Sequence, residues 1–308
     1  MSKLDFTKMH GIGNDYIYID VAKNKDLKEI FTRYSIGALV RYLSNRNFGI
    51  GGDGVIFIEK SMIADFKMRI FNSDGTEAEM CGNGIRCFAK YIYDQKLTEK
   101  DILKIETLAG IKEVKKEKHI LEPSKETIEQ YVVNMGKPII SGNLSISVLD
   151  KNIQLTKILI GNPHAVIFTK DIENIPIKKY GPLIENHKYF PQKTNVEFVE
   201  ILENNLIKMR VWERGSGETF ACGTGSCAAV VAGVSNNLIK RDVKVLLKGG
   251  ELDINWDKKT NNIYMKGIAT KVYDGIMEIW FYGSIFLCPK NHCWTISYFW
   301  YNWSILNY

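Results

Sequence analysis

The stretch Ser73-Asp74-Gly75-Thr76-Glu77-Ala78-Glu79-Met80-Cys81-Gly82-Asn83-Gly84-Ile85-Arg86-Cys87 returns in a second form as Gly215-Ser216-Gly217-Glu218-Thr219-Phe220-Ala221-Cys222-Gly223-Thr224-Gly225-Ser226-Cys227. Both copies read Glu-x-x-x-Cys-Gly-x-Gly and lead directly into an apolar run of helical length, over residues 85–93 and 228–234. We therefore expect a cysteine at each helix N-terminus, beside backbone N–H groups without intrahelical partners and at the positive end of the dipole. Such a position binds anions and favours a thiolate. Two copies in one chain indicate two facing half-sites.

Short strand patterns surround both motifs. Alternating or β-branched runs predict strands over residues 4–9, 16–20, 55–59, 66–72, 206–212, 243–247, 252–256, 263–266 and 276–281, and an amphipathic pattern predicts one helix over residues 27–43. Short strands with one strong helix in each half predict an α+β fold of two similar lobes. Because the two cysteines are about half a chain apart, a divergent internal duplication is a reasonable inference.

The polar stretch over residues 117–130 is our candidate boundary, giving an N-terminal lobe of residues 1–125 and a C-terminal lobe of residues 126–268. Residues 283–308 form an atypical tail, rich in aromatic residues and almost free of charge. This tail fits an extra strand pair, an interaction patch, a sequence with little selected structure or a disrupted reading frame. We expect no metal at its Cys288, His292 and Cys293.

Composition is that of an ordinary soluble globular protein, with 45% hydrophobic and 25% charged residues. The net charge of +6 is mild, and glutamates interrupt the densest basic stretch, residues 112–118, so no nucleic-acid partner is expected. No signal peptide and no membrane span are expected. Six cysteines without a secretory signal and without zinc-ligand spacing indicate free thiols in a reducing cytoplasm.

Two thiols on facing helix N-termini suit inversion of a carbon centre next to a carboxylate. The amides of residues 82–84 and 223–225 would hold the substrate carboxylate, one cysteine as thiolate would remove the α-proton, and the other would deliver a proton to the opposite face. Preorganised N–H donors would stabilise the enolate-like charge that develops. No cofactor motif is present, and none is required by this chemistry.

Other interpretations of the same residues stay open. The two cysteines could be small cap residues that only pack, or they could form a reversible disulfide. Cys87 and Cys227, inside the helices, are expected to pack in the core. His164 alone could be a structural histidine, and Asn14 could belong to a plain hairpin turn.

Taken together, these motifs resemble the diaminopimelate epimerase family, cofactor-independent racemases and epimerases with two cysteines. The matching stretches are KMHGIGNDY, FGIGGDG, NSDGTEAEMCGNGIRC, GNPHAV, TNVEFV, ERGSGETFACGTGSCA and the Gly-Gly-Glu-Leu that begins at Gly249, in family order up to about residue 281. The resemblance implies two pseudo-symmetric α/β lobes, each a mixed sheet around a central helix, with the active site between them. It also implies that a segment at about residues 269–282 returns to the first lobe, and that the protein is a homodimer with Tyr273 near the contact.

The same resemblance implies an activity and its residues. The reaction would interconvert LL- and meso-2,6-diaminopimelate in lysine and peptidoglycan precursor synthesis, with Cys81 and Cys222 as acid–base pair supported by His164 and Glu213. The reacting α-carboxylate would bind Gly82, Asn83, Gly223 and Thr224. The rest of the substrate would lie against Asn14, Asn72, Asn162, Asn195, Glu213 and Arg214. A related racemase with another substrate, or a non-catalytic thiol redox or binding protein on the same fold, are the alternatives.

Overall fold

The computed structural model describes residues 2–121, 125–149 and 151–279, so the tail over residues 283–308 lies outside the described part. The first half of the chain contains β1 (Ser2–Gly11), β2 (Asn14–Asp20), α1 (Leu27–Arg33), α2 (Ile36–Ser44), β3 (Gly54–Glu59), β4 (Phe66–Asn72), β5 (Glu77–Ala78), α3 (Gly82–Asp94), β6 (Ile102–Thr107), β7 (Gly110–Leu121), β8 (Glu126–Gly136) and β9 (Ile139–Val148). The second half contains β10 (Lys151–Leu159), β11 (Pro163–Thr169), α4 (Ile177–Glu185), β12 (Asn195–Glu203), β13 (Leu206–Glu213), β14 (Gly217–Thr219), α5 (Gly223–Ser235), β15 (Asp242–Leu247), β16 (Gly250–Trp256), β17 (Ile263–Ile268) and β18 (Thr270–Ile279).

The two halves repeat one series of strand pairings. In the first half β1–β2 is antiparallel, β2–β3 parallel, β3–β4 and β4–β5 antiparallel, β4–β6 parallel, and β6–β7 and β7–β8 antiparallel. In the second half the pairs β10–β11, β11–β12, β12–β13, β13–β14, β13–β15, β15–β16 and β16–β17 have the same directions in the same order. This repetition supports the duplication inferred from the two cysteine motifs.

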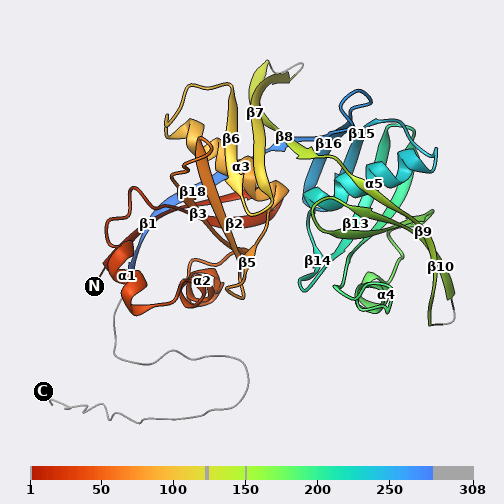
Figure 1. Cartoon of the computed structure of the whole chain (residues 1–308), viewed down its shortest axis with the longest axis horizontal. Helices are drawn as coiled ribbons and strands as arrows, with labels where there is room; N and C mark the ends of the chain where they lie inside the picture. Colours follow the sequence, from red (N-terminus) through yellow and green to blue (C-terminus); the bar gives the residue numbers. More distant parts are fainter. Residues whose placement is uncertain (1, 122–124, 150, 280–308) are drawn as a thin grey trace, which may run out of the picture.

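The lobes exchange their last strands. β18, at the end of the described chain, pairs with β1 of the first lobe, whereas β9 pairs with β10 of the second. β8 and β17 pair with each other, so the sheet is continuous from one lobe to the other. Figure 1 shows the two lobes side by side, with the blue β18 lying along the red β1. The lobe boundary that we propose, between residues 125 and 126, falls between β7 and β8.

Each lobe places its sheet between a central helix and an outer layer, which is α1 and α2 in the first lobe and α4 in the second. In β2, Tyr16 and Tyr18 pack in the large cluster around α3 and α5, while Ile17 and Ile19 pack on the other face with residues of α1 and α2. Strands buried on both faces read as nearly continuous apolar runs, which explains the sequence of β2 and β3. In β12, Val199 faces the central cluster, and its neighbour Phe198 faces α4. Few residues of α5 reach solvent, since it is buried from Gly223 to Gly233.

The helix predicted over residues 27–43 is wrong in one respect, because two helices occupy this stretch. Tyr34 adopts an extended conformation (φ −127°, ψ 134°) and ends α1. Ser35 then caps α2, since its side chain accepts a hydrogen bond from the Ala38 N–H at 3.3 Å. The apolar period continues across the break, so it did not reveal the break. Among the described residues, no helix combines the length and apolar character needed to cross a membrane.

Candidate active site

Each motif cysteine caps a central helix. Cys81 is the N-cap of α3 and Cys222 the N-cap of α5, both with extended backbone angles (φ −133°, ψ 120° and φ −126°, ψ 113°). Each sulfur accepts a hydrogen bond at 3.4 Å from the N–H three residues on, that of Gly84 or Gly225. The prediction that both cysteines stand at helix N-termini is thus confirmed.

The two helix N-termini face each other in direct contact. A Cβ atom added to Gly82 would lie 3.5 Å from the Cα of Gly223, and one added to Gly223 would lie 3.4 Å from the Cα of Gly82. Met265 of β17 fills the remaining space, 2.8 Å from the former position and 2.9 Å from the latter. Glycine after each cysteine therefore permits an approach that any side chain would obstruct.

Asn83 ties the two helix starts together. Its Nδ2 donates to the carbonyl oxygen of Ala221 at 3.2 Å, and its Oδ1 accepts from Nη2 of Arg86 at 2.9 Å. The side chain of Asn83 is therefore engaged within the protein.

Cys81 lies among polar groups of the first lobe. Its Sγ donates to Oδ1 of Asn14 at 3.3 Å. Burial raises the pKa of the Cys81 thiol, and the Gly84 N–H opposes this shift without reversing it. Burial likewise raises the pKa of Tyr16 well above its usual value.

Cys222 is more deeply buried, with 5% of its surface exposed. Its Sγ lies 3.5 Å from Oγ1 of Thr224. Burial, then the negative charges of Glu213 and Glu197, raise the pKa of this thiol well above its usual value. At both cysteines desolvation outweighs the N–H donors, so the pKa of each thiol lies above its usual value.

Glu213 is a carboxylic acid with a shifted pKa near both sulfurs. Burial raises its pKa to about 6, while hydrogen bonds from Thr219 and Cys222 oppose the shift. Oγ1 of Thr219 donates to Oε1 of Glu213 at 2.5 Å. The charge of Glu213 also acts on Cys81, so one carboxyl group influences both thiols.

His164 belongs to a buried hydrogen-bonded chain. Its Nδ1 lies 2.6 Å from Oε1 of Glu197, its Nε2 lies 2.9 Å from Oδ1 of Asn162, and the His164 and Glu197 side chains are 0% exposed. Oε2 of Glu197 is buried without a hydrogen-bond partner among the described residues. A Cβ on Gly225 would lie 2.7 Å from Oε1 of Glu197, so this pair sits directly beneath the start of α5.

The remaining predicted residues lie at strand ends. Asn195 donates from Nδ2 to the carbonyl oxygen of Pro163 at 3.1 Å and accepts from the N–H of Arg214 at 2.9 Å, so it joins β11 to the turn after β13. The guanidinium of Arg214 contacts the carbonyl oxygen of Gln192 at 3.3 Å. Asn72 is exposed and donates to Oγ1 of Thr76 at 3.2 Å.

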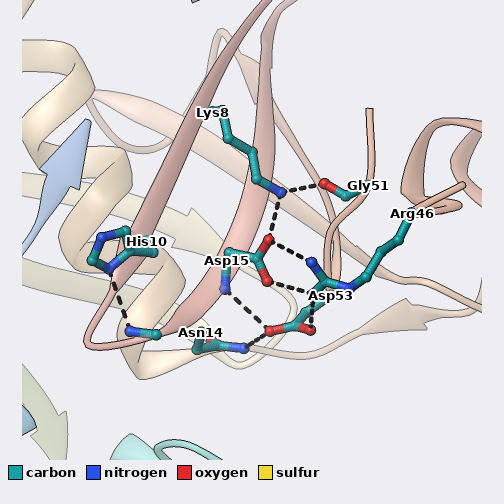
Figure 2. Close-up of polar contacts among 8 residues, drawn as sticks. Lys8, His10, Asn14, Asp15, Arg46, Gly51 and Asp53 are labelled. Atoms are coloured by element: carbon teal, nitrogen blue, oxygen red, sulfur yellow. Dashed lines mark hydrogen bonds and ion pairs between the residues drawn. The ribbon is translucent and has the colours of Figure 1, made fainter. Parts of the chain in front are cut away.

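Four residues at this site were not predicted from the sequence: Tyr16, Asp53, Arg86 and Glu197. Arg86 is 0% exposed and donates to the carbonyl oxygens of Gly82 and Ile268, at 3.2 Å each. Figure 2 shows Asp53 accepting from Asn14. A charged residue inside an apolar strand, as in Asn-Val-Glu-Phe-Val, was the available signal for Glu197.

Cys87 and Cys227 pack in the central cluster, as predicted, with 1% and 0% exposure. Burial raises the pKa of Cys87 to about 11 and that of Cys227 to about 12. All four cysteines within the described residues are free. No group of three or more potential ligands that could hold a metal ion occurs in that part of the chain.

Comparison with known proteins identifies the family. The sequence model of diaminopimelate epimerase matches residues 6–140 and 156–272. The chain belongs to the diaminopimelate epimerase family. A diaminopimelate epimerase of Methanococcus maripaludis (strain C6) is 46% identical over 291 residues, covering 90% of this chain and 100% of the relative. One from Agathobacter rectalis is 47% identical over 296 residues, with the same coverage.

Solved structures show the same two-lobed fold at low sequence identity. A Bacillus anthracis phenazine biosynthesis protein of the PhzF family superposes with a TM-score of 0.68 at 16% identity, covering 91% of this chain and 100% of that chain. A hydroxyproline epimerase from Agrobacterium vitis, with bound trans-4-hydroxy-L-proline, gives 0.65 at 14% identity, covering 89% and 92%. The expected α+β fold of two lobes is confirmed, and so is the resemblance to the diaminopimelate epimerase family.

Proposed function

We propose that this chain interconverts LL- and meso-2,6-diaminopimelate without a cofactor, using Cys81 and Cys222 as its two acid–base groups. Family membership makes the protein an isomerase of lysine biosynthesis. The observation that carries the two-base mechanism is the contact between two cysteine-capped helix N-termini, in which Gly82 and Gly223 touch. A carbon held beside this contact, in front of both helix N-termini, would have one sulfur on each side.

The reacting α-carboxylate is held by the first backbone N–H groups of both helices, those of Gly82, Asn83, Gly223 and Thr224. These groups have no carbonyl partner within their own helix, and they lie at the positive ends of both dipoles. When the α-proton leaves, negative charge moves onto the carboxylate oxygens, and donors fixed in advance stabilise it by several kcal/mol. No cofactor is needed to hold this charge.

The proton inventory starts from two neutral thiols. Because burial raises both thiol pKa values, a base must first take a proton from one of them. Glu213, with its pKa raised to about 6, is ionised at neutral pH and hydrogen-bonds Cys222. The thiolate so formed takes the α-proton, and the opposite thiol gives its proton to the carbanion. The enzyme returns to its starting form when the sulfurs and Glu213 exchange protons with water. His164, with Glu197, is the second supporting base.

The remainder of diaminopimelate is bound by Asn14, Asn72, Asn162, Asn195, Glu213 and Arg214. Amide groups can both donate and accept, and a guanidinium can clamp a carboxylate, so this set suits the distal amino-acid end. A related amino-acid racemase with another substrate is the second candidate, favoured by the fold shared with a structure that holds trans-4-hydroxy-L-proline.

The proposed working form is a cytoplasmic homodimer, with an N-terminal lobe of residues 1–125 plus the returning segment and a C-terminal lobe of residues 126–268. A reducing compartment keeps both catalytic thiols free. Support for a dimer comes from β18, whose Val272, Tyr273 and Ile276 are 53%, 44% and 62% exposed. No nucleic acid or membrane partner is indicated.

The test is exchange of the α-hydrogen in deuterated water with LL- and meso-diaminopimelate, using reduced protein and the variants Cys81→Ala and Cys222→Ala. Deuterium incorporation with inversion, abolished in both variants, is the expected result. Exchange on proline but not on diaminopimelate would keep the mechanism and exclude the substrate. No exchange on any amino acid by folded, reduced protein would exclude the enzyme.

A further inference from the structure

The carboxamide of Asn14 lies between Cys81 and Asp53. Sγ of Cys81 is 3.3 Å from Oδ1 of Asn14, and Nδ2 of Asn14 donates to Oδ2 of Asp53 at 2.8 Å. An ionised carboxylate can only accept hydrogen bonds, so the amide nitrogen turns toward Asp53 and the amide oxygen is left facing the sulfur. We propose that Asp53 is a positioning residue that fixes Asn14 in this orientation and thereby keeps Cys81 protonated, as the proton donor of the resting enzyme.

The orientation matters because the two ends of an amide favour opposite forms of a thiol. The oxygen accepts a hydrogen bond from S–H and repels a thiolate, whereas the nitrogen would donate to a thiolate and favour it. This inference rests on the proposed two-base function, in which one sulfur must start as acid and the other as base. It assigns the acid to Cys81 and makes Cys222 the thiol that first loses its proton to Glu213.

Asp53 is held from several directions, so it can impose an orientation on Asn14. Its Oδ2 also accepts from the N–H of Asp15 at 3.1 Å, and its own N–H donates to the carbonyl oxygen of Asp15 at 2.8 Å. Its Oδ1 accepts from Nη2 of Arg46 at 2.9 Å. Because β2 and β3 are parallel neighbours, their starting ends bring Asn14 and Asp53 together (Figure 2).

Asp15 anchors this cluster to the sheet. Nζ of Lys8 lies 2.6 Å from Oδ2 of Asp15 and also donates to the carbonyl oxygen of Gly51, and Lys8 is 7% exposed (Figure 2). Arg46 adds hydrogen bonds of 2.6 and 3.1 Å to Asp15, but its side chain is 58% exposed, so solvent weakens that pair. The buried Lys8–Asp15 pair is therefore the fixed part.

Other groups act on the Cys81 sulfur and must be held constant in any test. They are the titratable or charged side chains Tyr16, Tyr18, Arg86, Cys87 and Glu213. Tyr16 and the Gly84 N–H donate to the sulfur and favour the thiolate, whereas Glu213 opposes it. Asn14 differs from all of them because its effect changes sign when the amide turns over.

The experiment measures alkylation of Cys81 by iodoacetamide between pH 6 and 10, in a Cys222→Ala background, by mass spectrometry of the Cys81 peptide. Asp53→Ala removes the acceptor, so the amide can turn and offer its nitrogen to the sulfur. The profile is expected to move to lower pH. A shift of one pKa unit would raise the rate at pH 7 about three- to fourfold, because the lower nucleophilicity of the more acidic thiolate offsets part of the tenfold gain.

The matched variant is Asp53→Asn, which removes the charge but keeps an acceptor oxygen. It is expected to restore the parental profile. A profile of Asp53→Asn shifted as far as that of Asp53→Ala would show that charge alone acts on Cys81, and would overturn the proposal. So would an unchanged profile in a folded Asp53→Ala protein.

Asn14→Ala provides a second variant if Asp53→Ala does not fold. Alkylation of Cys81 in this variant should become faster at pH 7 if the amide oxygen faces the sulfur, and slower if the amide nitrogen does. The direction of the change in rate therefore decides which end of the Asn14 amide faces Cys81. None of these measurements uses a substrate. A failure of the epimerase assay therefore leaves the positioning result intact, and the reverse also holds.

Discussion

Nδ1 of His164 lies 2.6 Å from Oε1 of Glu197, and neither side chain has any exposure to solvent. Their strands, β11 and β12, are parallel neighbours, and Asn195 is the register partner of His164. Glu197 is thus two residues further along β12, on the same face of the sheet, beneath α5. A buried carboxylate in this position fixes the ring of His164 and determines which nitrogen carries the proton.

Glu197→Gln should therefore lower kcat while leaving the fold intact. The amide keeps the volume and one acceptor oxygen but removes the negative charge beside the His164 ring, so we expect a loss of kcat on the order of 10- to 100-fold with little change in KM. The free energy of unfolding should fall modestly, because the amide keeps one acceptor for His164 but places N–H donors at the position of Oε2, which has no hydrogen-bond partner among the described residues. Steady-state kinetics and urea unfolding measure both effects.

The control for this variant is Glu200→Gln, on the same strand. Its carboxylate accepts from the N–H of Ile172 at 3.4 Å, away from His164. It should leave kcat unchanged. Equal losses of kcat in Glu197→Gln and Glu200→Gln would mean that the Glu197 substitution acts by disturbing β12 and not through His164.

Gly82→Ala should force the two helix starts apart. The new methyl group would lie 2.8 Å from Cε of Met265 and 3.5 Å from the Cα of Gly223. Overpacking of this kind costs about 1–3 kcal/mol, and displacement of one sulfur from the substrate would lower kcat as well. Met265→Ala makes room for the methyl group, so the double variant should recover part of the activity lost by Gly82→Ala. If a double-mutant cycle of Gly82→Ala and Met265→Ala showed no coupling energy, the contact between Gly82 and Met265 would be contradicted.

The cysteine motifs made the centre of this site predictable. Cys-Gly-x-Gly before a helix is a local pattern, and local patterns fix caps, as Cys81 and Cys222 show. The pairing of His164 with Glu197 spans 33 residues and that of Cys81 with Asn14 spans 67, so neither leaves a local signal. The pairings of His164 with Glu197 and of Cys81 with Asn14 can be identified only when the registers of the sheet are known.

Electrostatics could be predicted only in part for the same reason. A helix N-terminus lowers the pKa of a thiol, but the opposing effect, burial by the other lobe, depends on tertiary packing. At Cys222 burial is the larger effect. The split between α1 and α2 was likewise hidden, since the apolar residues keep their spacing while Tyr34 turns to an extended conformation.

Glu213→Gln should change the pH dependence of stability in a definite direction. Burial raises the pKa of Glu213 from 4.5 to about 6, so the fold favours the protonated acid. This stabilisation is complete below the unfolded pKa of 4.5 and is lost as the pH rises through 6. The free energy of unfolding of the variant, measured relative to the parent, should therefore rise by about 1–2 kcal/mol between pH 4 and pH 7.5. This range allows for partial contact of the carboxyl group with solvent. Epimerisation should fall sharply.

Glu218→Gln, in the same hairpin, should show the opposite sign. Burial raises the pKa of Glu218, but hydrogen bonds from Lys248 and Arg210 outweigh it and lower the pKa below its usual value. Its stabilisation is present above the unfolded pKa and is lost as the pH falls. Chemical unfolding at several pH values gives the free energy of unfolding of both variants relative to the parent. If this quantity changed with pH in the same direction in both, the raised pKa of Glu213 would be contradicted.

Arg86→Lys should destabilise the protein although it keeps the charge. The guanidinium makes hydrogen bonds to Gly82, Asn83 and Ile268 from a fully buried position, and so connects the start of α3 to the end of β17. A lysine ammonium lacks the planar fork that reaches these acceptors together, so about 2–4 kcal/mol should be lost. Arg41→Lys is the matched control. Within the described part of the chain, the exposed Arg41 makes one hydrogen bond, to the carbonyl oxygen of Asp74, so this variant should lose less than about 0.5 kcal/mol. Equal losses in the free energy of unfolding of both variants, measured with urea, would refute a joining role for Arg86.

If Arg86 does join the lobes, the Arg86→Lys variant should also lose activity at temperatures well below its unfolding transition, because the two cysteine-capped helices would no longer be held at a fixed separation.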